Sequence, residues 1–333
     1  MIVDIYTHIF PTKFFESWQK IAPQLGNIAK RIGQVEPVHN LDQRFRAMDR
    51  AGTDYCHIVS LPNPPLEDFS TPELGAELAK LANDTMAEVV AKNRDRLPAF
   101  VAAIPMHNLD FAMKEIDRAV LQLGAKGIQI FTNIKGKPLD LPEYRPVFAR
   151  MAELDLPIWL HPARNASMTD YATEKSSRYE IWWAFGWPYE TQVACSRLVF
   201  SGLFDRHPNI KIVTHHGGGG IPFFDGRIEE GFRTLGARTS DEDYSKVIPS
   251  LKRPLLDYFK MFYADTALMG GSIGVKASLE FFGPDRVVFA TDSPFAPIVP
   301  TLEAIKRLDL EPSVLERMNQ DNAEKLMNMK FGD

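Results

Sequence analysis

Histidine and aspartate side chains stand where several apolar segments of this 333-residue chain end. His8, His161, His216 and Asp292 each close or follow a run of strand-forming residues. Imidazole nitrogens and carboxylate oxygens are suitable ligands for a borderline divalent ion such as zinc, and three protein ligands with one open position suit catalysis. Each residue alone could be an ordinary buried, hydrogen-bonded side chain. The prediction of a metal site therefore depends on all four meeting at one place.

Eight short apolar segments would carry these residues, and helices separate most of them. Buried parallel strands are typically continuous apolar runs. Helical spacing and capping residues predict helices over 41–51, 71–94, 110–123 and 144–154. The strands are expected at 1–10, 54–61, 99–104, 127–131, 157–161, 210–214, 261–265 and 286–291.

This alternation predicts an α/β protein, a (β/α)8 TIM barrel with an insertion after the first strand. The active site of such a barrel lies at the carboxyl ends of its strands. The insertion is expected at residues 12–40, which have an irregular pattern with Pro23, Gly26, Gly33 and Pro37. The alternative is a doubly wound open sheet, but no GxGxxG motif follows the first strand. The glycine run at 217–220 also lacks the lysine and hydroxyl residue of a phosphate-binding loop.

The composition is that of one globular domain spanning residues 1–333. Hydrophobic residues make up 45% of the chain and charged residues 24%, which provides for a substantial core. The net charge is only -5 and basic residues are scattered, so we expect neither nucleic acid nor an anionic membrane as a partner. The two cysteines, Cys56 and Cys195, cannot form a disulfide framework. We see neither a secretion signal nor a long apolar span, and expect a cytoplasmic protein.

Two further segments could contribute to a site. The glycines at 217–220 would permit unusual backbone dihedrals and the close approach of a ligand beside His216, although a plain loop is the other interpretation. The aromatic residues between Tyr179 and Tyr189 could form core, a subunit interface or the wall of a pocket for a flat substrate.

These residues together resemble the second amidohydrolase family. This branch of the amidohydrolase superfamily includes aminocarboxymuconate semialdehyde decarboxylase and the resorcylate and carboxyvanillate decarboxylases. The likeness extends over nearly the whole chain. It rests on residues 4–11, on Leu160-His161-Pro162, on His216-Gly217-Gly218-Gly219 with Pro222, and on residues 290–295.

The resemblance implies roles for particular residues. The family holds its metal with a first-strand HxH motif, the strand-five histidine and the strand-eight aspartate, which correspond to Tyr6 with His8, His161 and Asp292. The histidine before the glycine run, which assists catalysis in the family, matches His216. His215 is an extra neighbour to which the resemblance assigns no role. The helix with Arg44 and Arg46 resembles the segment whose arginine binds a substrate carboxylate, and Arg44 is our candidate.

The chain departs from the family pattern at Tyr6, which replaces the first histidine of the motif. Relatives also vary this position, often to glutamate, so the change alone does not remove the metal. Tyr6 could ligate as a phenolate, because a nearby cation lowers its pKa from about 10. It could instead hydrogen-bond a metal-bound water, or fill space.

The expected function is that of a metal-dependent decarboxylase of an aromatic or unsaturated carboxylic acid. It would use one divalent ion, zinc or manganese, without an organic cofactor. His216 or Asp292 would supply a proton, while Arg44 and aromatic residues including Trp187 would bind the substrate. The family likeness suggests a homodimer. Two alternatives remain open, namely a metal-dependent hydrolase or hydratase, and a metal-free barrel with a binding or regulatory role.

Overall fold

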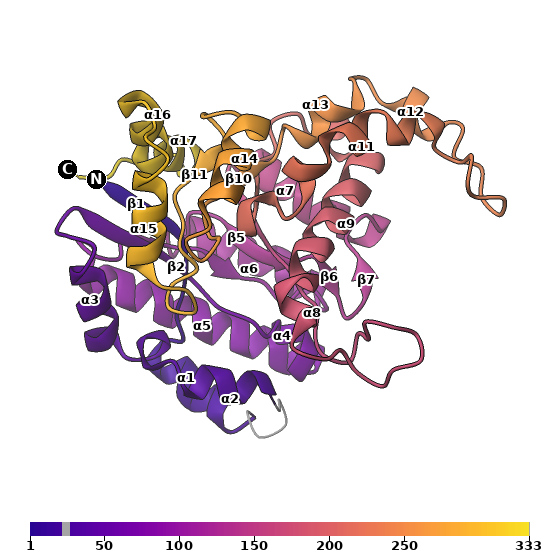
Figure 1. Ribbon diagram of the computed structural model, residues 1–333. Helices are drawn as coiled ribbons and strands as arrows, with labels where there is room; N and C mark the ends of the chain where they lie inside the picture. The colour runs from indigo at the N-terminus through magenta and orange to yellow at the C-terminus, as the bar shows by residue number, and fades with distance from the viewer. Residues whose placement is uncertain (22–26, 333) are drawn as a thin grey trace.

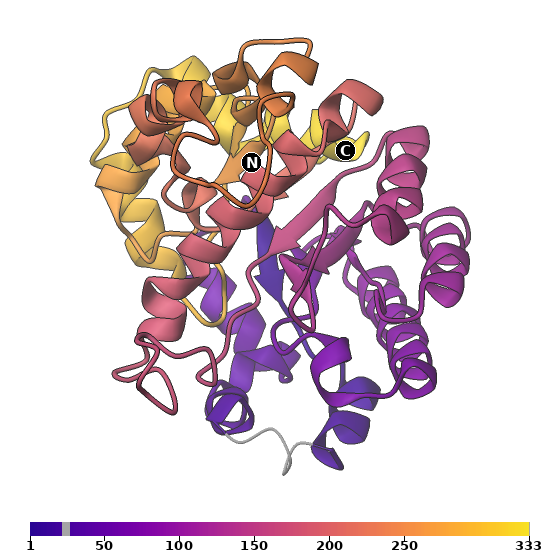
Figure 2. The same ribbon diagram turned by 90° about the vertical axis from the view of Figure 1, so that its right-hand side faces the viewer.

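Parallel strands enclosed by helices form the body of the protein (Figures 1 and 2). The structure is a computed structural model and describes residues 1–21 and 27–332, apart from the side chains of residues 27 and 28. The parallel strands are β1 (Ile2–His8), β2 (Tyr55–Ser60), β3 (Ala99–Phe100), β4 (Ala102–Ala103), β5 (Ile128–Phe131), β8 (Ile158–His161), β9 (Ile212–Thr214), β10 (Tyr263–Asp265) and β11 (Val287–Val288). A short antiparallel hairpin consists of β6 (Asn133–Ile134) and β7 (Lys137–Pro138).

Backbone hydrogen bonds join the parallel strands into a ring. One sheet has the order β1-β2-β3 and the other β11-β10-β9-β8-β5-β4. The single predicted third strand is divided into β3 and β4 at Val101, whose N–H donates to Val59 O over 2.9 Å. At the other end, Ile5 N–H donates to Phe289 O over 3.1 Å and His8 N–H donates to Ser293 O over 2.8 Å. The predicted α/β barrel is confirmed.

The last strand is shorter than the expected 286–291. Its ladder ends after Val288 because Phe289 N–H donates to Met318 O, outside the sheet, over 2.8 Å. The chain then leaves the regular strand conformation, and Asp292 has a φ of +68°.

The helices after the strands follow the sequence prediction closely. α3 (Leu41–Asp49), α5 (Pro72–Lys92), α6 (Leu109–Leu121) and α7 (Arg145–Leu154) lie where helical spacing predicts them. Asn40, Thr71 and Asn108 cap the first three of these helices by accepting a hydrogen bond from the N–H three residues later. The further helices are α4 (Leu66–Phe69), α8 (Ile181–Ala184), α9 (Gly186–Phe200), α10 (Leu203–Arg206), α11 (Asp225–Glu229), α12 (Val247–Ser250), α13 (Leu255–Phe259), α14 (Ser272–Phe282), α15 (Ile298–Lys306), α16 (Pro312–Glu316) and α17 (Asn322–Met327).

The insertion after β1 is more regular than we expected. It contains α1 (Thr12–Gln19), α2 (Asn27–Gly33) and the short turn η2 (Glu36–Val38), whereas Pro23 and Gly26 lie outside the described residues. α1 forms because Phe14 and Trp18, four residues apart, bury the same face, and the rings of Phe10 and Trp18 lie 5.1 Å apart. The prolines and glycines further along obscured this spacing in the sequence.

Apolar side chains fill both the barrel interior and the layer under the helices. The interior cluster includes Trp159, which is fully buried and whose Nε1–H donates to Ile5 O over 2.9 Å. Residues 162–180 and the segment from η6 (Gly231–Thr234) to α12 project from the barrel (Figure 1). Within the described residues, no helix is long and apolar enough to span a membrane.

Candidate active site

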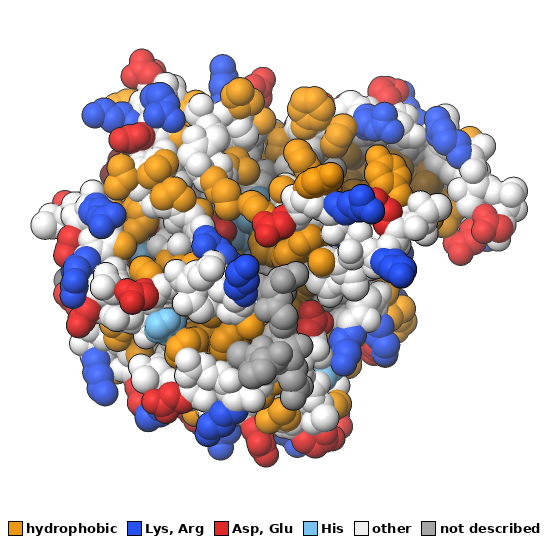
Figure 3. All heavy atoms as spheres, turned by 60° about the horizontal axis from the view of Figure 1, so that its bottom comes forward, with side chains coloured by type: hydrophobic (Ala, Val, Ile, Leu, Met, Phe, Trp, Pro, Cys, Tyr) orange, Lys and Arg blue, Asp and Glu red, His pale blue; other side chains and the backbone are white. Residues whose placement is uncertain are grey.

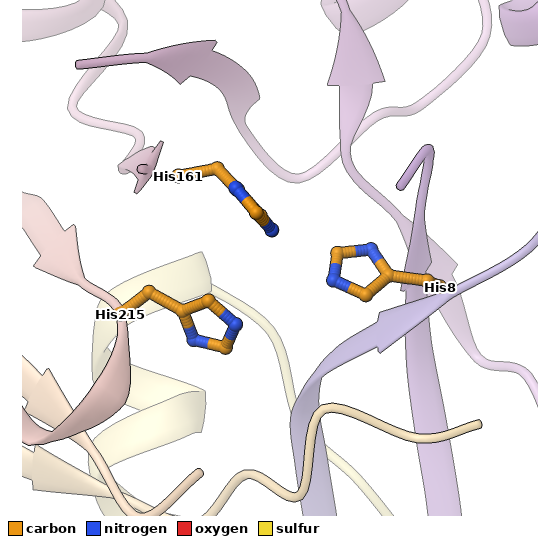
Figure 4. Close-up of side chains that lie close together, drawn as sticks. All are labelled: His8, His161 and His215. Carbon is orange, nitrogen blue, oxygen red and sulfur yellow. The ribbon is translucent and has the colours of Figure 1, made fainter. Parts of the chain in front are cut away.

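Three imidazole rings from three strand ends point toward one another (Figure 4). His8 closes β1, His161 closes β8 and His215 follows β9. One ring nitrogen of each lies within 4.8 Å of the corresponding nitrogens of the other two. His215, His216 and Asp292 form a second such group, so His215 belongs to both. The structure therefore brings together the four predicted residues and adds His215 at their centre.

The hydrogen bonds of the three rings leave the same nitrogen free on each. His8 Nδ1 lies 3.2 Å from Ser60 Oγ, whose own hydroxyl donates to Thr7 O over 3.4 Å. The Nδ1 of His161 lies 2.8 Å from Pro162 O, and the Nδ1 of His215 contacts the carboxylate of Asp265. Each Nδ1 thus faces an oxygen that can accept its proton, although His161 Nδ1 also lies 3.1 Å from the amide nitrogen of Asn63. A ring that holds its proton on Nδ1 can offer Nε2 to a metal ion. Burial lowers the pKa of His215, but Asp265 and Asp292 outweigh burial and raise it to about 9, so this ring also carries a proton on Nε2 that a bound cation would displace.

The carboxylate of Asp292 lies beside these free nitrogens. Its Oδ1 is 3.2 Å from His8 Nε2 and 3.6 Å from His215 Nε2, and its Oδ2 is 4.0 Å from His216 Nε2. Burial acts to raise the pKa of Asp292, but the adjacent His215 and His8 outweigh burial and hold the pKa below its usual value. Asp292 is therefore a buried carboxylate anion surrounded by imidazoles.

The donor set fits a divalent cation. Among the described side chains, the buried atoms without a hydrogen-bond partner include His8 Nε2, His215 Nε2 and Tyr6 Oη. Buried polar atoms are rarely left without a partner, and their grouping here indicates a ligand that satisfies them together. Neutral imidazoles with one carboxylate suit zinc or another first-row divalent ion.

Tyr6 lies against this cluster. Its ring stacks on that of His215, with centroids 3.8 Å apart and planes 13° apart. The side chain is fully buried, and its hydroxyl makes no hydrogen bond to the described part of the chain. Burial, and then the charges of Asp265 and Asp292, raise the pKa of Tyr6 well above its usual value. Without a cation nearby, the side chain is a neutral phenol.

His216 occupies the edge of the cluster instead of its centre. It has a φ of +55°, and its ring stacks on His215 and faces Trp187, with centroids 3.8 and 6.0 Å away. Burial, followed by the charge of His215, lowers the pKa of His216 to about 3. The unusual backbone predicted after it is present: Gly217 has a φ of +66° and donates its N–H to Asp265 Oδ1 over 2.9 Å.

The sequence analysis assigned no role to His215 and did not include Asp265 among the site residues. For each of them, the position relative to a strand would have indicated a place in the site. Val213 points into the barrel interior, so strand alternation places His215 on the same face. Asp265 closes β10, a strand-end position like those of the other site residues. It orients His215 and also holds the backbone of the glycine run.

A cavity of about 200 Å³ opens onto the cluster. Trp182, Trp183 and Trp187 form much of its wall, and the indole N–H of Trp187 donates to Arg164 O over 3.0 Å. The aromatic segment thus forms a pocket wall, one of the interpretations left open by its sequence. The other lining residues are His8, Arg31, Ile32, Pro62, Asn63, His161, Glu180, Met269, Asp292 and Phe295.

The position of Arg44 does not match its expected role in binding a substrate carboxylate. Its side chain is 1% exposed and does not line the cavity. The guanidinium donates to the carbonyl of His8 and lies 3.0 Å from His57 Nδ1. Among the described residues that line the cavity, the arginine is Arg31, from α2.

A parallel α/β barrel with histidines and an aspartate clustered at its strand ends defines a TIM-barrel enzyme of the metal-dependent class. The chain belongs to the amidohydrolase family, whose sequence model matches residues 3–328.

Similar proteins are named as decarboxylases. Gamma-resorcylate decarboxylase of Rhodococcus jostii (strain RHA1) is 32% identical over 301 residues, covering 86% of this chain and 87% of that protein. The 2-amino-3-carboxymuconate-6-semialdehyde decarboxylase of Dictyostelium discoideum is 28% identical over 308 residues, covering 88% and 81%. A crystal structure of dihydroxybenzoic acid decarboxylase from Polaromonas sp. JS666, with bound manganese and the inhibitor 2-nitroresorcinol, has a TM-score of 0.79 and 26% identity, covering 98% and 96%.

Proposed function

We propose that the protein is a metal-dependent decarboxylase of a small aromatic or unsaturated carboxylic acid. The observation that carries this proposal is the convergence of the imidazoles of His8, His161 and His215, with the buried carboxylate of Asp292 beside them, next to a tryptophan-walled cavity. The names of the relatives support the same reaction, and the manganese in the Polaromonas structure supports a divalent ion.

His8, His161 and Asp292 are the proposed protein ligands of this ion, and His215 offers a further nitrogen within reach. Zinc and manganese are both compatible with these donors, and no organic cofactor is required. When bound, the ion would supply Lewis-acid polarisation of the substrate carboxylate or of a hydroxyl beside it.

The surrounding residues would then carry the proton transfer. Asp292 and His216 are both deprotonated in the free site, so one of them would first take a proton from a substrate hydroxyl or from water. It would then deliver this proton to the carbon that bears the carboxylate, and a carbon–hydrogen bond forms there. The bond to the carboxylate carbon breaks next, its electron pair stays with the substrate and restores the conjugated system, and carbon dioxide leaves. Both residues border the cluster, and their side chains are 8% and 13% exposed, which limits exchange of that proton with water.

A substrate panel tests the reaction. Purified protein loaded with manganese would be incubated with 2,6-dihydroxybenzoate, 5-carboxyvanillate and 6-methylsalicylate while carbon dioxide and the remaining products are measured. Release of carbon dioxide with formation of the matching phenol supports the proposal. Ring opening or water addition without carbon dioxide would instead indicate a hydratase or hydrolase.

Trp187 is the proposed stacking partner for the substrate ring, because it lines the cavity close to His161 and His216. We expect Trp187→Ala to raise KM roughly 10-fold, about 1.4 kcal/mol, with a smaller change in kcat, since an aromatic contact is lost. Trp187→Phe keeps a flat ring and should recover most of the affinity. Steady-state kinetics of both variants check this, and an unchanged KM in Trp187→Ala would remove Trp187 from the substrate site.

Tyr6 is proposed to donate a hydrogen bond to a group bound at the cation, because its buried hydroxyl lacks a partner in the described structure. We expect Tyr6→Phe to lower kcat by roughly 10- to 100-fold, the effect of losing a hydrogen bond to a charged group. Manganese affinity, measured by titration, should stay within a few-fold of wild type. A large drop in that affinity would show that Tyr6 is itself a metal ligand.

The protein's partners are proposed to be small molecules and a second copy of the chain. On the face shown in Figure 3, acidic and basic side chains are interspersed, which gives no continuous basic surface there for nucleic acid. Tyr171, Tyr179, Phe185, Tyr189 and Phe223 are large apolar side chains left exposed on the projecting segments and near them, and they would suit a homodimer interface. Light scattering of the purified protein would measure its mass in solution and so test the homodimer. Two free, buried cysteines favour the reducing cytoplasm as its location.

A further inference from the structure

A chain of buried hydrogen bonds lies beside the histidine cluster. Arg44 contacts His57 Nδ1 at 3.0 Å, and His57 Nε2 lies 3.1 Å from the hydroxyl of Tyr55. The Tyr55 hydroxyl donates to Asp4 Oδ2 over 2.5 Å, and the hydroxyl of Thr291 donates to the same oxygen over 2.5 Å. All five side chains are buried. We call Arg44, His57, Tyr55, Asp4 and Thr291 the Arg44–Asp4 relay.

The two ends of the relay fix the direction of every hydrogen bond in it. The guanidinium of Arg44 can only donate, so His57 Nδ1 accepts and the proton of His57 lies on Nε2. That N–H donates to Tyr55, whose hydroxyl is then free to donate to the carboxylate of Asp4. Burial, and then the charges of Arg44 and Arg96, lower the pKa of His57 well below its usual value, which is consistent with a neutral ring that accepts from Arg44.

Each end of the relay is attached to a residue of the proposed metal site. At one end, the guanidinium of Arg44 donates to the backbone carbonyl of His8. At the other end, Asp4 Oδ1 accepts the backbone N–H of Thr291 over 3.0 Å, and Thr291 directly precedes Asp292. The backbone N–H of Asp292 in turn donates to Tyr6 O over 3.1 Å. The relay therefore connects the two backbone segments that carry His8 and Asp292.

Backbone hydrogen bonds, among them His8 N–H to Ser293 O over 2.8 Å, also join the two segments, and the relay adds side-chain restraints to them. The ladder of β11 ends at Val288, four residues before Asp292. Asp292 itself has a φ of +68°, a conformation that costs free energy in a residue with a side chain and persists only when its surroundings hold it. Through Thr291, the carboxylate of Asp4 provides such a restraint at the neighbouring residue.

We propose that the Arg44–Asp4 relay positions His8 and Asp292 for a common cation, and that Arg44 is a positioning residue with no part in substrate binding. The inference rests on the proposed metal site. Outer partners that orient metal ligands typically contribute 10- to 100-fold to metal affinity. A loss of that size is the effect expected when the relay is broken.

The most direct variant is Tyr55→Phe, which removes only the hydroxyl in the middle of the relay. Tyr258→Phe is a matched control, because Tyr258 is also fully buried and donates to an aspartate, Asp205, over 2.6 Å, in a separate network between α10 and α13. Both variants and the wild type would be titrated with manganese alone, well below the melting temperature of each. The visible absorption of the cobalt-loaded proteins would report the coordination geometry.

We expect Tyr55→Phe to bind manganese 10- to 100-fold more weakly and to show a shifted cobalt spectrum. Tyr258→Phe should melt at a lower temperature but keep the wild-type affinity and spectrum. Arg44→Lys, which retains a charge and one donor, should lie between Tyr55→Phe and the wild type. If Tyr55→Phe does not fold, Thr291→Val removes a different hydroxyl of the relay and is measured in its place.

These measurements distinguish a failure of the positioning role from a failure of the proposed metal site. Wild-type affinity and spectrum in a folded Tyr55→Phe or Thr291→Val variant would overturn the positioning role, leaving the relay a purely structural feature. If the wild-type protein itself binds neither manganese nor cobalt, the proposed metal site is wrong, and the relay cannot act through it.

Discussion

The Asp292→Asn variant is expected to release carbon dioxide roughly 10³-fold more slowly than the wild type, the size of effect typical when a positioned acid or base is lost. Asparagine keeps the shape of the side chain but removes both its negative charge and its ability to carry the proton. It also leaves His8 and His215 facing a neutral amide at the distances where they now face a carboxylate. Initial rates at saturating substrate and manganese measure the loss.

Glu67→Gln is the matched control for this substitution. Glu67 is another buried carboxyl group, on α4, and it accepts the N–H of Met106 over 2.6 Å, away from the cavity wall. Burial raises the pKa of Glu67 to about 7, so an uncharged amide should be tolerated there. We expect activity close to that of the wild type. Equal losses in Glu67→Gln and Asp292→Asn would show a general sensitivity to altered buried carboxyl groups and would contradict a specific role for Asp292.

Removal of the metal ion with a chelator should abolish release of carbon dioxide, and adding manganese or zinc back should restore it. The cluster would then lack the positive charge of the ion, which the proposed reaction requires to polarise the substrate. Readdition should also stabilise the fold, by about 2.7 kcal/mol when the free metal concentration is 100-fold above Kd. Melting curves and activity would be recorded on the same samples.

Two results would contradict this expectation. Full activity of protein shown by elemental analysis to contain no metal would exclude the metal-dependent mechanism. A melting temperature that does not change with manganese or zinc, in a protein that nevertheless decarboxylates, would place the ion outside the buried cluster. Magnesium is a useful comparison, because it prefers oxygen ligands and should stabilise this nitrogen-rich site less than either transition metal.

The barrel and most of its site could be predicted because they depend on local patterns. Buried parallel strands are continuous apolar runs, and their carboxyl ends meet on one face, so His8, His161 and Asp292 could be grouped before any contact was known. His215 required one further step, the alternation that pairs it with Val213. Its neighbour His216 was predicted from its place after a strand, with a catalytic role implied by resemblance, and the structure places that residue at the edge of the cluster.

The environment of Arg44 could not be read from the sequence. Arg44 lies on a short helix among other charged residues, where a solvated guanidinium is the usual arrangement. Its burial depends on His57, which β2 contributes, and on the carbonyl of His8 from β1. The position of Arg31 at the cavity could not be predicted from the sequence either, because it depends on how the insertion after β1 packs over the barrel.

The wall of the cavity and its floor come from different parts of the chain. The floor is made of residues at strand ends, held by the barrel itself, whereas Glu180, Trp182 and Trp183 belong to α8 and the projecting segment before it. Substitutions there can alter which acids fit without disturbing the imidazoles. This separation would let related enzymes diverge in substrate preference while they keep the same catalytic residues, and residues 180–183 are where directed evolution of new substrate preferences should begin.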